Sequence, residues 1–219
     1  MYNLLNMKLK VNEIYYSIQG ESSYTGLPCI FIRLTYCNLR CTYCDSEYTF
    51  HDGNNMSIND ILETIKQYSC KLVEVTGGEP LVQKECITLL KKLVDLDYEV
   101  LLETSGSLTI KDVPKQVINI IDFKCPSSGM KKKNHWDNIN YLKPNDEVKF
   151  IIEDREDYEW AKIKIRQYNL NKKSKILMSP SYNKIEEKEI VDWILKDNLN
   201  VKFQIQLHKI IWKDTDRGV

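Results

Sequence analysis

The sequence lacks long hydrophobic runs and has no excess of charge of either sign. No stretch approaches the roughly 20 apolar residues that cross a bilayer, and the N-terminal MYNLLNMKLK contains no apolar signal-peptide segment. Lysine plus arginine equals aspartate plus glutamate, at 31 each, so no net charge attracts nucleic acid or an anionic membrane. We therefore expect a cytosolic protein without nucleic-acid or membrane partners, whose ligands must be inferred from individual sites.

The chain also lacks internal repeats and low-complexity segments. Its 219 residues, 42% of them apolar, can bury one substantial core but are few for two. We expect a single domain over residues 1–219.

Strands alternate with helices along the sequence. Ser57, with an acidic residue three places later, has the pattern of a helix N-terminus, and residues 124–134 look like a polar loop. The alternation predicts an α/β protein with a mostly parallel sheet. Expected strands cover 11–18, 29–34, 71–75, 98–102, 117–122, 147–152, 175–178 and 201–207, and expected helices cover 57–68, 82–94, 154–168 and 186–196.

Parallel sheets of this kind bind ligands at the carboxyl ends of their strands. Glycine, hydroxyl and charged residues gather at these positions in the sequence. They are Arg33, TGGEP at 76–80, ETSG at 103–106, DFK at 122–124 and MSPS at 178–181.

Seven cysteines are present, and three of them are close together. The odd number and the missing secretory signal argue against a disulfide framework. The four scattered ones fit small buried side chains: Cys29, Cys70, Cys86 and Cys125. The other three form a Cys-x3-Cys-x2-Cys pattern within YCNLRCTYCDS, residues 36–46.

These three thiols lack a fourth cysteine partner. A structural zinc site takes four ligands, which His51 could complete, so a non-catalytic zinc or iron–sulfur module stays open. A [4Fe–4S] cluster held by three thiolates instead leaves one iron free for a ligand that is not protein. Such an open iron is a catalytic arrangement.

CNLRCTYC resembles the Cys-x3-Cys-x-aromatic-Cys signature of radical S-adenosylmethionine enzymes. TGGEP, one strand later, resembles the glycine-rich segment of that family. The resemblance implies a partial, truncated TIM-like (β/α) barrel and S-adenosylmethionine bound at the open iron. It makes Cys37, Cys41 and Cys44 the ligands of the [4Fe–4S] cluster that generates the radical.

A narrower resemblance covers nearly the whole chain. EIYYSIQGE (13–21), FIRL (31–34), CDS (44–46), ETSG and the tail QLHKIIW with a terminal RGV resemble the 7-carboxy-7-deazaguanine synthase family. This family consists of carbon–nitrogen lyases that convert 6-carboxy-5,6,7,8-tetrahydropterin to 7-carboxy-7-deazaguanine with loss of ammonia, for queuosine and related 7-deazapurines. The resemblance also implies a homodimer and an external one-electron donor of the flavodoxin or ferredoxin type.

The resemblance assigns residues to three ligands. DFK departs from the Ser-Pro-Lys of the family, so Lys124 alone carries over directly there. Magnesium is assigned to Ser46, and the substrate to Ile18, Gln19, Gly20, Arg33 and Thr76. S-adenosylmethionine is assigned to Tyr43, Cys44, Asp45, Gly78, Glu79, Asp122, Phe123, Lys124, Met178, Ser179, Pro180 and Ser181.

The implied division of the chain is a substrate-binding segment 11–34, a cluster loop 35–56, a half-barrel core 57–207 and a C-terminal tail 208–219.

A glycyl-radical activating enzyme shares the three-cysteine cluster but acts on a protein backbone, and the Gln-Gly segment and RGV tail favour the synthase. We expect Lys131 to Lys133 to be a solvated surface.

Overall fold

A mixed nine-stranded sheet organises the computed structural model, which describes residues 7–213, 215 and 217–219. The remaining positions, 1–6, 214 and 216, belong to the expected domain and tail but lie outside the described residues. The strands are β1 Lys8–Ile18, β2 Pro28–Leu34, β3 Asn54–Ser57, β4 Leu72–Gly77, β5 Glu99–Thr104, β6 Ile118–Asp122, β7 Glu147–Ile152, β8 Lys175–Pro180 and β9 Lys202–Phe203.

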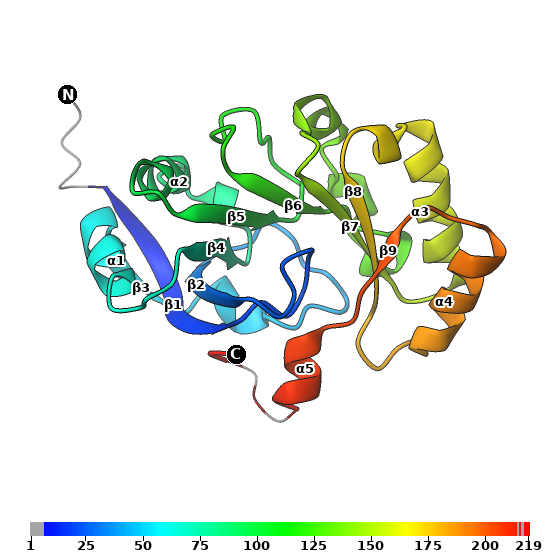
Figure 1. Cartoon of the computed structure of the whole chain (residues 1–219), viewed down its shortest axis with the longest axis horizontal. Coiled ribbons are helices and arrows are strands. Elements are labelled where there is room, and N and C mark those ends of the chain that lie inside the picture. Colours follow the sequence, from blue (N-terminus) through cyan, green and yellow to red (C-terminus); the bar gives the residue numbers. More distant parts are fainter. Residues whose placement is uncertain (1–6, 214, 216) are drawn as a thin grey trace.

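The strands lie in the order β3-β1-β2-β4-β5-β6-β7-β8-β9. Neighbours from β2 through β9 are parallel, whereas β1 pairs antiparallel with both β2 and β3. The edge strands β3 and β9 do not pair with each other, so the curved sheet stays open (Figure 1). The predicted α/β class, with a mostly parallel sheet in a partial barrel, is confirmed.

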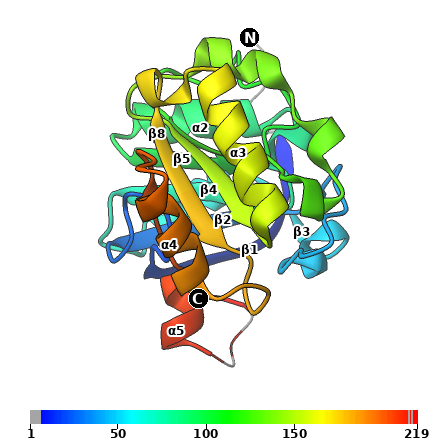
Figure 2. The same cartoon turned by 90° about the vertical axis from the view of Figure 1, so that its right-hand side faces the viewer.

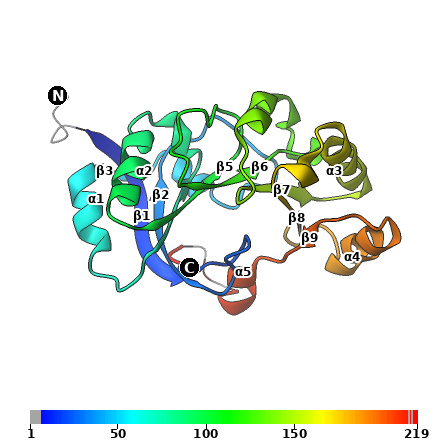
Figure 3. The ribbon, with the colours of Figure 1, turned by 45° about the horizontal axis from the view of Figure 1, so that its top comes forward.

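Helices cover the outer side of this curved sheet. In Figure 2, α3 and α4 lie in front of β8, and in Figure 3, α2 and α3 lie on one side of the sheet with α5 on the other. No helix within the described ranges is long and apolar enough to cross a membrane. The α-helices are α1 Ile58–Ile65, α2 Cys86–Asp95, α3 Arg155–Gln167, α4 Glu187–Lys196 and α5 Leu207–Ile211. The 3-10 turns are η2 Glu47–Phe50, η3 Pro80–Val82, η4 Pro126–Ser128, η5 Lys131–Lys133, η6 Trp136–Tyr141 and η7 Leu170–Lys172.

Side-chain caps fix where α1 and α3 begin. Ser57 Oγ accepts a hydrogen bond from the Asp60 amide at 3.1 Å, and the Asp60 carboxylate accepts from the Ser57 amide at 3.3 Å. This reciprocal pair is the capping box that the sequence predicts. Asp154 caps α3 with a single hydrogen bond, because its carboxylate accepts from the Asp157 amide at 2.9 Å.

Helix α2 begins four residues later than the expected Val82. Gln83 is in an extended conformation, and its side chain bonds the neighbouring backbone. Gln83 Nε2 donates to Lys10 O at 2.9 Å and to Thr35 O at 3.0 Å, while Lys10 N donates to Gln83 Oε1 at 2.7 Å. These bonds tie the segment to β1 and delay the helix until Cys86.

The expected strand over 201–207 is mostly wrong. Strand β9 covers Lys202–Phe203, and the last contact with β8 is the Gln204 amide bonded to Met178 O at 3.0 Å. The chain then crosses to the β1–β2 connection, where the Leu207 amide donates to Gly20 O at 2.9 Å and α5 begins. Strand β3, inside the expected cluster loop, was also not predicted.

Three apolar clusters leave the inner side of the sheet open at one end. On the outer side, α1 and α2 pack on β1 to β5, and α3 and α4 pack on β6 to β8. Replacing a fully buried side chain such as Leu93 by alanine should lower the free energy of unfolding by about 2–5 kcal/mol. The third cluster, which includes Phe31, Leu72 and Leu101, fills the inner side toward the amino ends of the strands. Polar groups occupy the carboxyl ends.

Candidate active site

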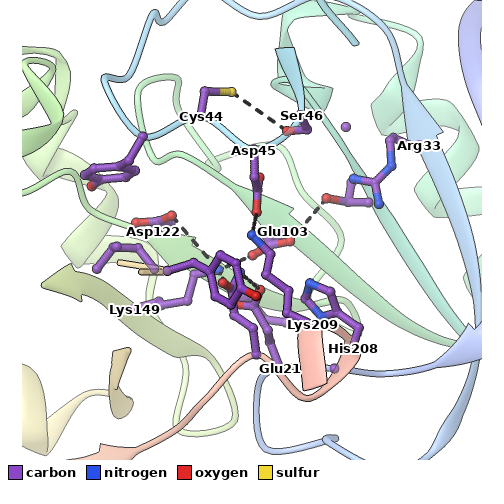
Figure 4. Close-up of a pocket in the computed structure, with 18 of the residues that line it drawn as sticks. Glu21, Arg33, Cys44, Asp45, Ser46, Glu103, Asp122, Lys149, His208 and Lys209 are labelled. Atoms are coloured by element: carbon purple, nitrogen blue, oxygen red, sulfur yellow. Dashed lines mark hydrogen bonds and ion pairs between the residues drawn. The ribbon is translucent and has the colours of Figure 1, made fainter. Parts of the chain in front are cut away.

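A cavity of about 500 Å³ lies on the inner side of the sheet at the carboxyl ends of the strands. Figure 4 shows Cys44 and Ser46 on one side of it and Glu21 and Lys149 on the other. Four predicted residues do not line the cavity: Glu79, Phe123, Met178 and Ser179. The predicted residues that line it are Ile18, Gln19, Gly20, Arg33, Cys37, Cys41, Tyr43, Cys44, Asp45, Ser46, Thr76, Gly78, Asp122, Lys124, Pro180 and Ser181.

The cysteine loop is anchored by backbone contacts. The Glu79 amide donates to Tyr36 O at 2.8 Å, and the Thr42 amide donates to Ser128 O at 3.2 Å. Thr42 Oγ1 adds a bond to Ser127 O at 2.6 Å. The loop is therefore held at one end by the glycine-rich segment and in the middle by the segment after β6.

Gly78 permits the first of these contacts. A β-carbon at this position would lie 2.4 Å from Tyr36 O and 2.8 Å from Cys37 Cβ. Both distances are shorter than any unstrained contact, so a side chain would push the cysteine loop away. The glycine of TGGEP thus brings the two predicted motifs together.

The three thiols are free and partly buried along the cavity wall. Burial raises the pKa of Cys37 and raises that of Cys41 to about 11, so a bound metal must stabilise the thiolate forms. Among residues 7–213, 215 and 217–219, no three histidine, cysteine or acidic side chains gather tightly enough for one metal ion. A [4Fe–4S] cluster takes each thiolate on a different iron. The all-sulfur donor set fits such a cluster, and the exposed His51 does not line the cavity.

Tyr43 and Asp122 each place an unbonded oxygen near the cysteine loop. Neither Tyr43 Oη nor Asp122 Oδ1 has a hydrogen-bond partner in the described part of the chain, although both atoms are buried. The other Asp122 oxygen accepts from Lys124 Nζ at 2.7 Å. These groups leave bonding capacity for a polar ligand.

The four predicted residues outside the cavity support its wall. Glu79 accepts hydrogen bonds from Thr104 Oγ1 at 2.8 Å and from the Ser105 amide at 2.8 Å, which fixes the loop after β5. Phe123 stacks on Trp136 with ring centroids 4.7 Å apart. Met178 belongs to the outer core, and Ser179 is fully buried.

Arg33 lies at the end of β2 with its side chain 16% exposed. Its Nε donates to Glu13 Oε1 at 2.7 Å, and its Nη2 donates to Tyr15 Oη at 2.6 Å. Tyr48 Oη donates to the same Glu13 oxygen at 3.1 Å. These partners hold a guanidinium at the cavity wall, where it can pair with an anionic ligand group.

Lys149 joins two acidic residues that sequence reasoning did not assign. Its ammonium donates to Glu21 Oε2 at 2.9 Å and also bonds Glu103. Burial raises the pKa of Glu21, but the charges of Lys149 and His208 and the hydrogen bonds from Gln206 and Lys149 together outweigh it, and the result is about 2. Glu21 and Glu103 lie inside the motifs that carried the resemblance. Lys149 could have been found as a charged residue in the interior of the buried strand 147–152.

The C-terminal segment covers the cavity from the side opposite the sheet. A β-carbon at Gly20 would lie 2.2 Å from His208 Nδ1, so glycine permits this contact. Lys209 Nζ donates to Asp45 Oδ2 at 2.8 Å (Figure 4), and Arg217 lies 4.2 Å from the Tyr48 ring centroid. His208 and Lys209 were not predicted as site residues, although His208 lies in the tail motif.

Ser46 presents a hydroxyl beside the cysteine loop. Its Oγ lies 3.9 Å from Cys44 Sγ and caps no backbone amide of η2. The hydroxyl lines the cavity next to Asp45.

Comparison with known proteins agrees with this geometry. The radical SAM superfamily model matches residues 31–194. A 7-carboxy-7-deazaguanine synthase of Koribacter versatilis is 44% identical, over 96% of this chain and all of the relative. One of Chlorobaculum tepidum is 41% identical, over 96% of this chain and 97% of the relative.

The crystal structure of QueE from Escherichia coli has the same fold, with a TM-score of 0.79 at 21% identity, and covers 94% of this chain and 97% of that one. The family found is the synthase family that the motifs indicate, rather than the activating enzymes or a metal-binding module. The chain belongs to the radical SAM superfamily and, within it, to the 7-carboxy-7-deazaguanine synthase family.

Proposed function

We propose that the protein converts 6-carboxy-5,6,7,8-tetrahydropterin to 7-carboxy-7-deazaguanine with loss of ammonia, as part of queuosine and related 7-deazapurine biosynthesis. The observation that carries this proposal is the joining of the cysteine loop, the glycine-rich segment and a polar surface in one cavity. Its volume of about 500 Å³ is within the usual range for small-molecule sites.

Cys37, Cys41 and Cys44 would hold a [4Fe–4S] cluster. When bound, and reduced by an external flavodoxin- or ferredoxin-type donor, this cluster supplies the electron that splits S-adenosylmethionine into methionine and a 5′-deoxyadenosyl radical. The chain contributes the anchored loop, and Gly78 keeps the neighbouring strand end close to it.

S-adenosylmethionine would lie between the cysteine loop and the ends of β4, β6 and β8. Tyr43 offers an aromatic face, and the Asp122–Lys124 pair offers charges of both signs. Cys44, Asp45, Gly78, Pro180 and Ser181 complete this side of the cavity. Glu79, Phe123, Met178 and Ser179 would act from behind the wall, because none of them lines the cavity.

The pterin would bind on the β1–β2–β4 side. Arg33 would pair with its carboxylate, since a planar guanidinium forms two parallel bonds with a carboxylate. Gln19 would bond the ring edge, with Ile18, Gly20 and Thr76 around it. In a pterin bound in this way, the C6 hydrogen that the radical removes would lie within the cavity and away from bulk water.

The proposal also includes the Mg²⁺ ligand, the oligomeric state and the cellular compartment. Ser46 would contribute one oxygen to Mg²⁺, which keeps several waters and readily shares an anionic ligand. All seven cysteines are free thiols, which suits a reducing cytosol. The homodimer rests on the family resemblance, and the single domain over 1–219 rests on the length and apolar content of the chain.

Anaerobic reconstitution with iron and sulfide tests the metal site. The protein should bind about four irons, and its EPR spectrum should change when S-adenosylmethionine is added. Cys41→Ser should lose the cluster, whereas Cys70→Ser, away from the cavity, should keep it. One tightly bound zinc with no iron uptake would overturn the proposal.

A further inference from the structure

Glu74 is a buried acid on the floor of the cavity. It lies in the middle of β4, is 3% exposed and lines the cavity. Gln19 Nε2 donates to Glu74 Oε2 at 2.5 Å, and Gln19 is itself oriented by the Glu21 amide, which donates to its Oε1 at 3.1 Å. No group in the described ranges donates to the second oxygen, Oε1.

Glu74 differs from the other acids that line the cavity. Five acidic side chains line the cavity, and four of them are paired with a lysine: Glu21 and Glu103 with Lys149, Asp45 with Lys209, and Asp122 with Lys124. Glu74 forms no ion pair within the described part of the chain. Burial, and after it the nearby Glu103, raise the pKa of Glu74 well above its usual value.

An unpaired buried carboxyl is unfavourable unless hydrogen-bond donors reach it. Gln19 supplies one donor, and no other group among the described residues supplies a second. The free oxygen faces a cavity that the proposed function fills with a ligand. A ligand edge that carries N–H groups would satisfy it.

The sheet register places the backbones of Glu74 and Arg33 close together. In the β2–β4 ladder, Phe31 is opposite Glu74 and Arg33 is opposite Thr76. The two Cα atoms are therefore separated by one strand spacing and two residues, about 8 Å. Because alternate residues share a face, Arg33 and Glu74 both point to the inner side.

The pterin carries its carboxylate on one ring and its hydrogen-bond donors, the 2-amino group and N3–H, on the far edge of the other ring. A carboxylate held by Arg33 directs that donor edge toward the Gln19–Glu74 pair. We propose that Glu74 is a specificity-determining residue that accepts hydrogen bonds from the 2-amino group and N3–H of the bound pterin. This inference rests on the proposed function.

If Glu74 accepts these hydrogen bonds, the site should reject a pterin analogue that lacks the 2-amino group. Replacing the 2-amino group by a 2-oxo group, as in the lumazine counterpart, exchanges a donor for an acceptor. Two acceptor oxygens then face each other in a buried site, which is unfavourable for binding. The wild-type protein should therefore bind 6-carboxytetrahydropterin more tightly than 6-carboxytetrahydrolumazine.

The test compares Glu74→Gln with Glu99→Gln. Glu99 is an exposed acid at the start of β5, away from the cavity, where it accepts from Tyr24 Oη. Dissociation constants for both analogues are measured with cluster-loaded protein and S-adenosylmethionine, and thermal unfolding shows that each variant is folded. Glu74→Gln should weaken pterin binding about 10- to 100-fold, leave lumazine binding equal or tighter, and so remove the discrimination. Glu99→Gln should match wild type.

Glu74→Asp gives a second measure, because it keeps the carboxyl group but withdraws it by one methylene. It should lose part of the discrimination. Equal weakening of both analogues by Glu74→Gln, or full discrimination in that variant, would overturn the inference while the proposed function stands. A wild-type protein that binds S-adenosylmethionine but neither turns over nor binds the pterin would instead overturn the proposed function.

Discussion

Lys209 Nζ lies 2.8 Å from Asp45 Oδ2, and this ion pair connects the last helix to the residue that follows the third cysteine. The two residues are 164 positions apart in the sequence. Together with the contact between His208 and Gly20, the pair fixes α5 over the cavity. The tail and the cysteine loop therefore form one wall.

Lys209→Met should loosen this wall. The pair is partly exposed, with Asp45 at 53%, so screening by water limits its strength and we expect KM for the pterin to rise no more than about five-fold. Lys188→Met is the matched control, because it removes an exposed ion pair with Asp192 on α4. Steady-state kinetics at low salt measure the effect. Identical kinetics for the two variants would show that the tether does not act on the cavity.

Arg33→Lys should lower kcat/KM for the pterin by about 10- to 100-fold. A lysine cannot bond Glu13 and Tyr15 and still offer two parallel bonds to a carboxylate. Arg155→Lys, which changes an exposed arginine on α3, should behave as wild type. If the 6-carboxyl and the 6-carboxamide analogues lose affinity equally in Arg33→Lys, Arg33 does not bind the carboxylate.

Ser46→Ala should reduce the stimulation of activity by Mg²⁺. Loss of one protein oxygen leaves the ion to water and the ligand, so half-maximal activation should need about ten-fold more Mg²⁺. A Mg²⁺ titration of the initial rate measures this shift, with the exposed Ser69→Ala as control. An unchanged titration curve would remove Ser46 as a ligand.

Glu74→Gln should stabilise the ligand-free protein at neutral pH. Burial and Glu103 raise the pKa of Glu74 above 4.5, although Gln19 and Lys149 act in the opposite direction. Between 4.5 and the raised value the unfolded chain has lost a proton that the folded protein keeps, so the free energy of unfolding falls as pH rises.

This fall in the free energy of unfolding with rising pH should be absent in Glu74→Gln. Its unfolding midpoint should match wild type near pH 4.5 and exceed it by about 2–4 °C near pH 8. Thermal scans between these pH values, with Glu99→Gln as control, measure the difference. Parallel curves for wild type and Glu74→Gln would contradict the raised pKa.

Much of the fold follows from local sequence patterns, and the misses have a tertiary cause. The alternation of apolar residues locates the buried strands, and the capping pattern at Ser57 locates the start of one helix. Nothing in NNMS (54–57) marks a strand, because β3 exists through its pairing with β1. The alternating apolar residues of 201–207 resemble a strand, but contact with β8 ends at Gln204 and the Gly20 carbonyl bonds the amide of Leu207.

The site could be predicted where its residues are adjacent in sequence. The cysteine spacing and TGGEP are local motifs, and the three cysteines and the first three residues of TGGEP line the cavity. Glu74 and Lys149 are charged residues in the interior of buried strands, and their roles depend on which strands lie beside them. The order of strands in the sheet, which the sequence alone did not supply, determines those neighbours.

Product formation tests the central claim most directly. Reconstituted protein is incubated anaerobically with 6-carboxytetrahydropterin, S-adenosylmethionine, Mg²⁺ and a reductant, and the mixture is analysed by mass spectrometry. The account predicts that 7-carboxy-7-deazaguanine and ammonia form in equal amounts. Cleavage of S-adenosylmethionine without any deazapurine would contradict it.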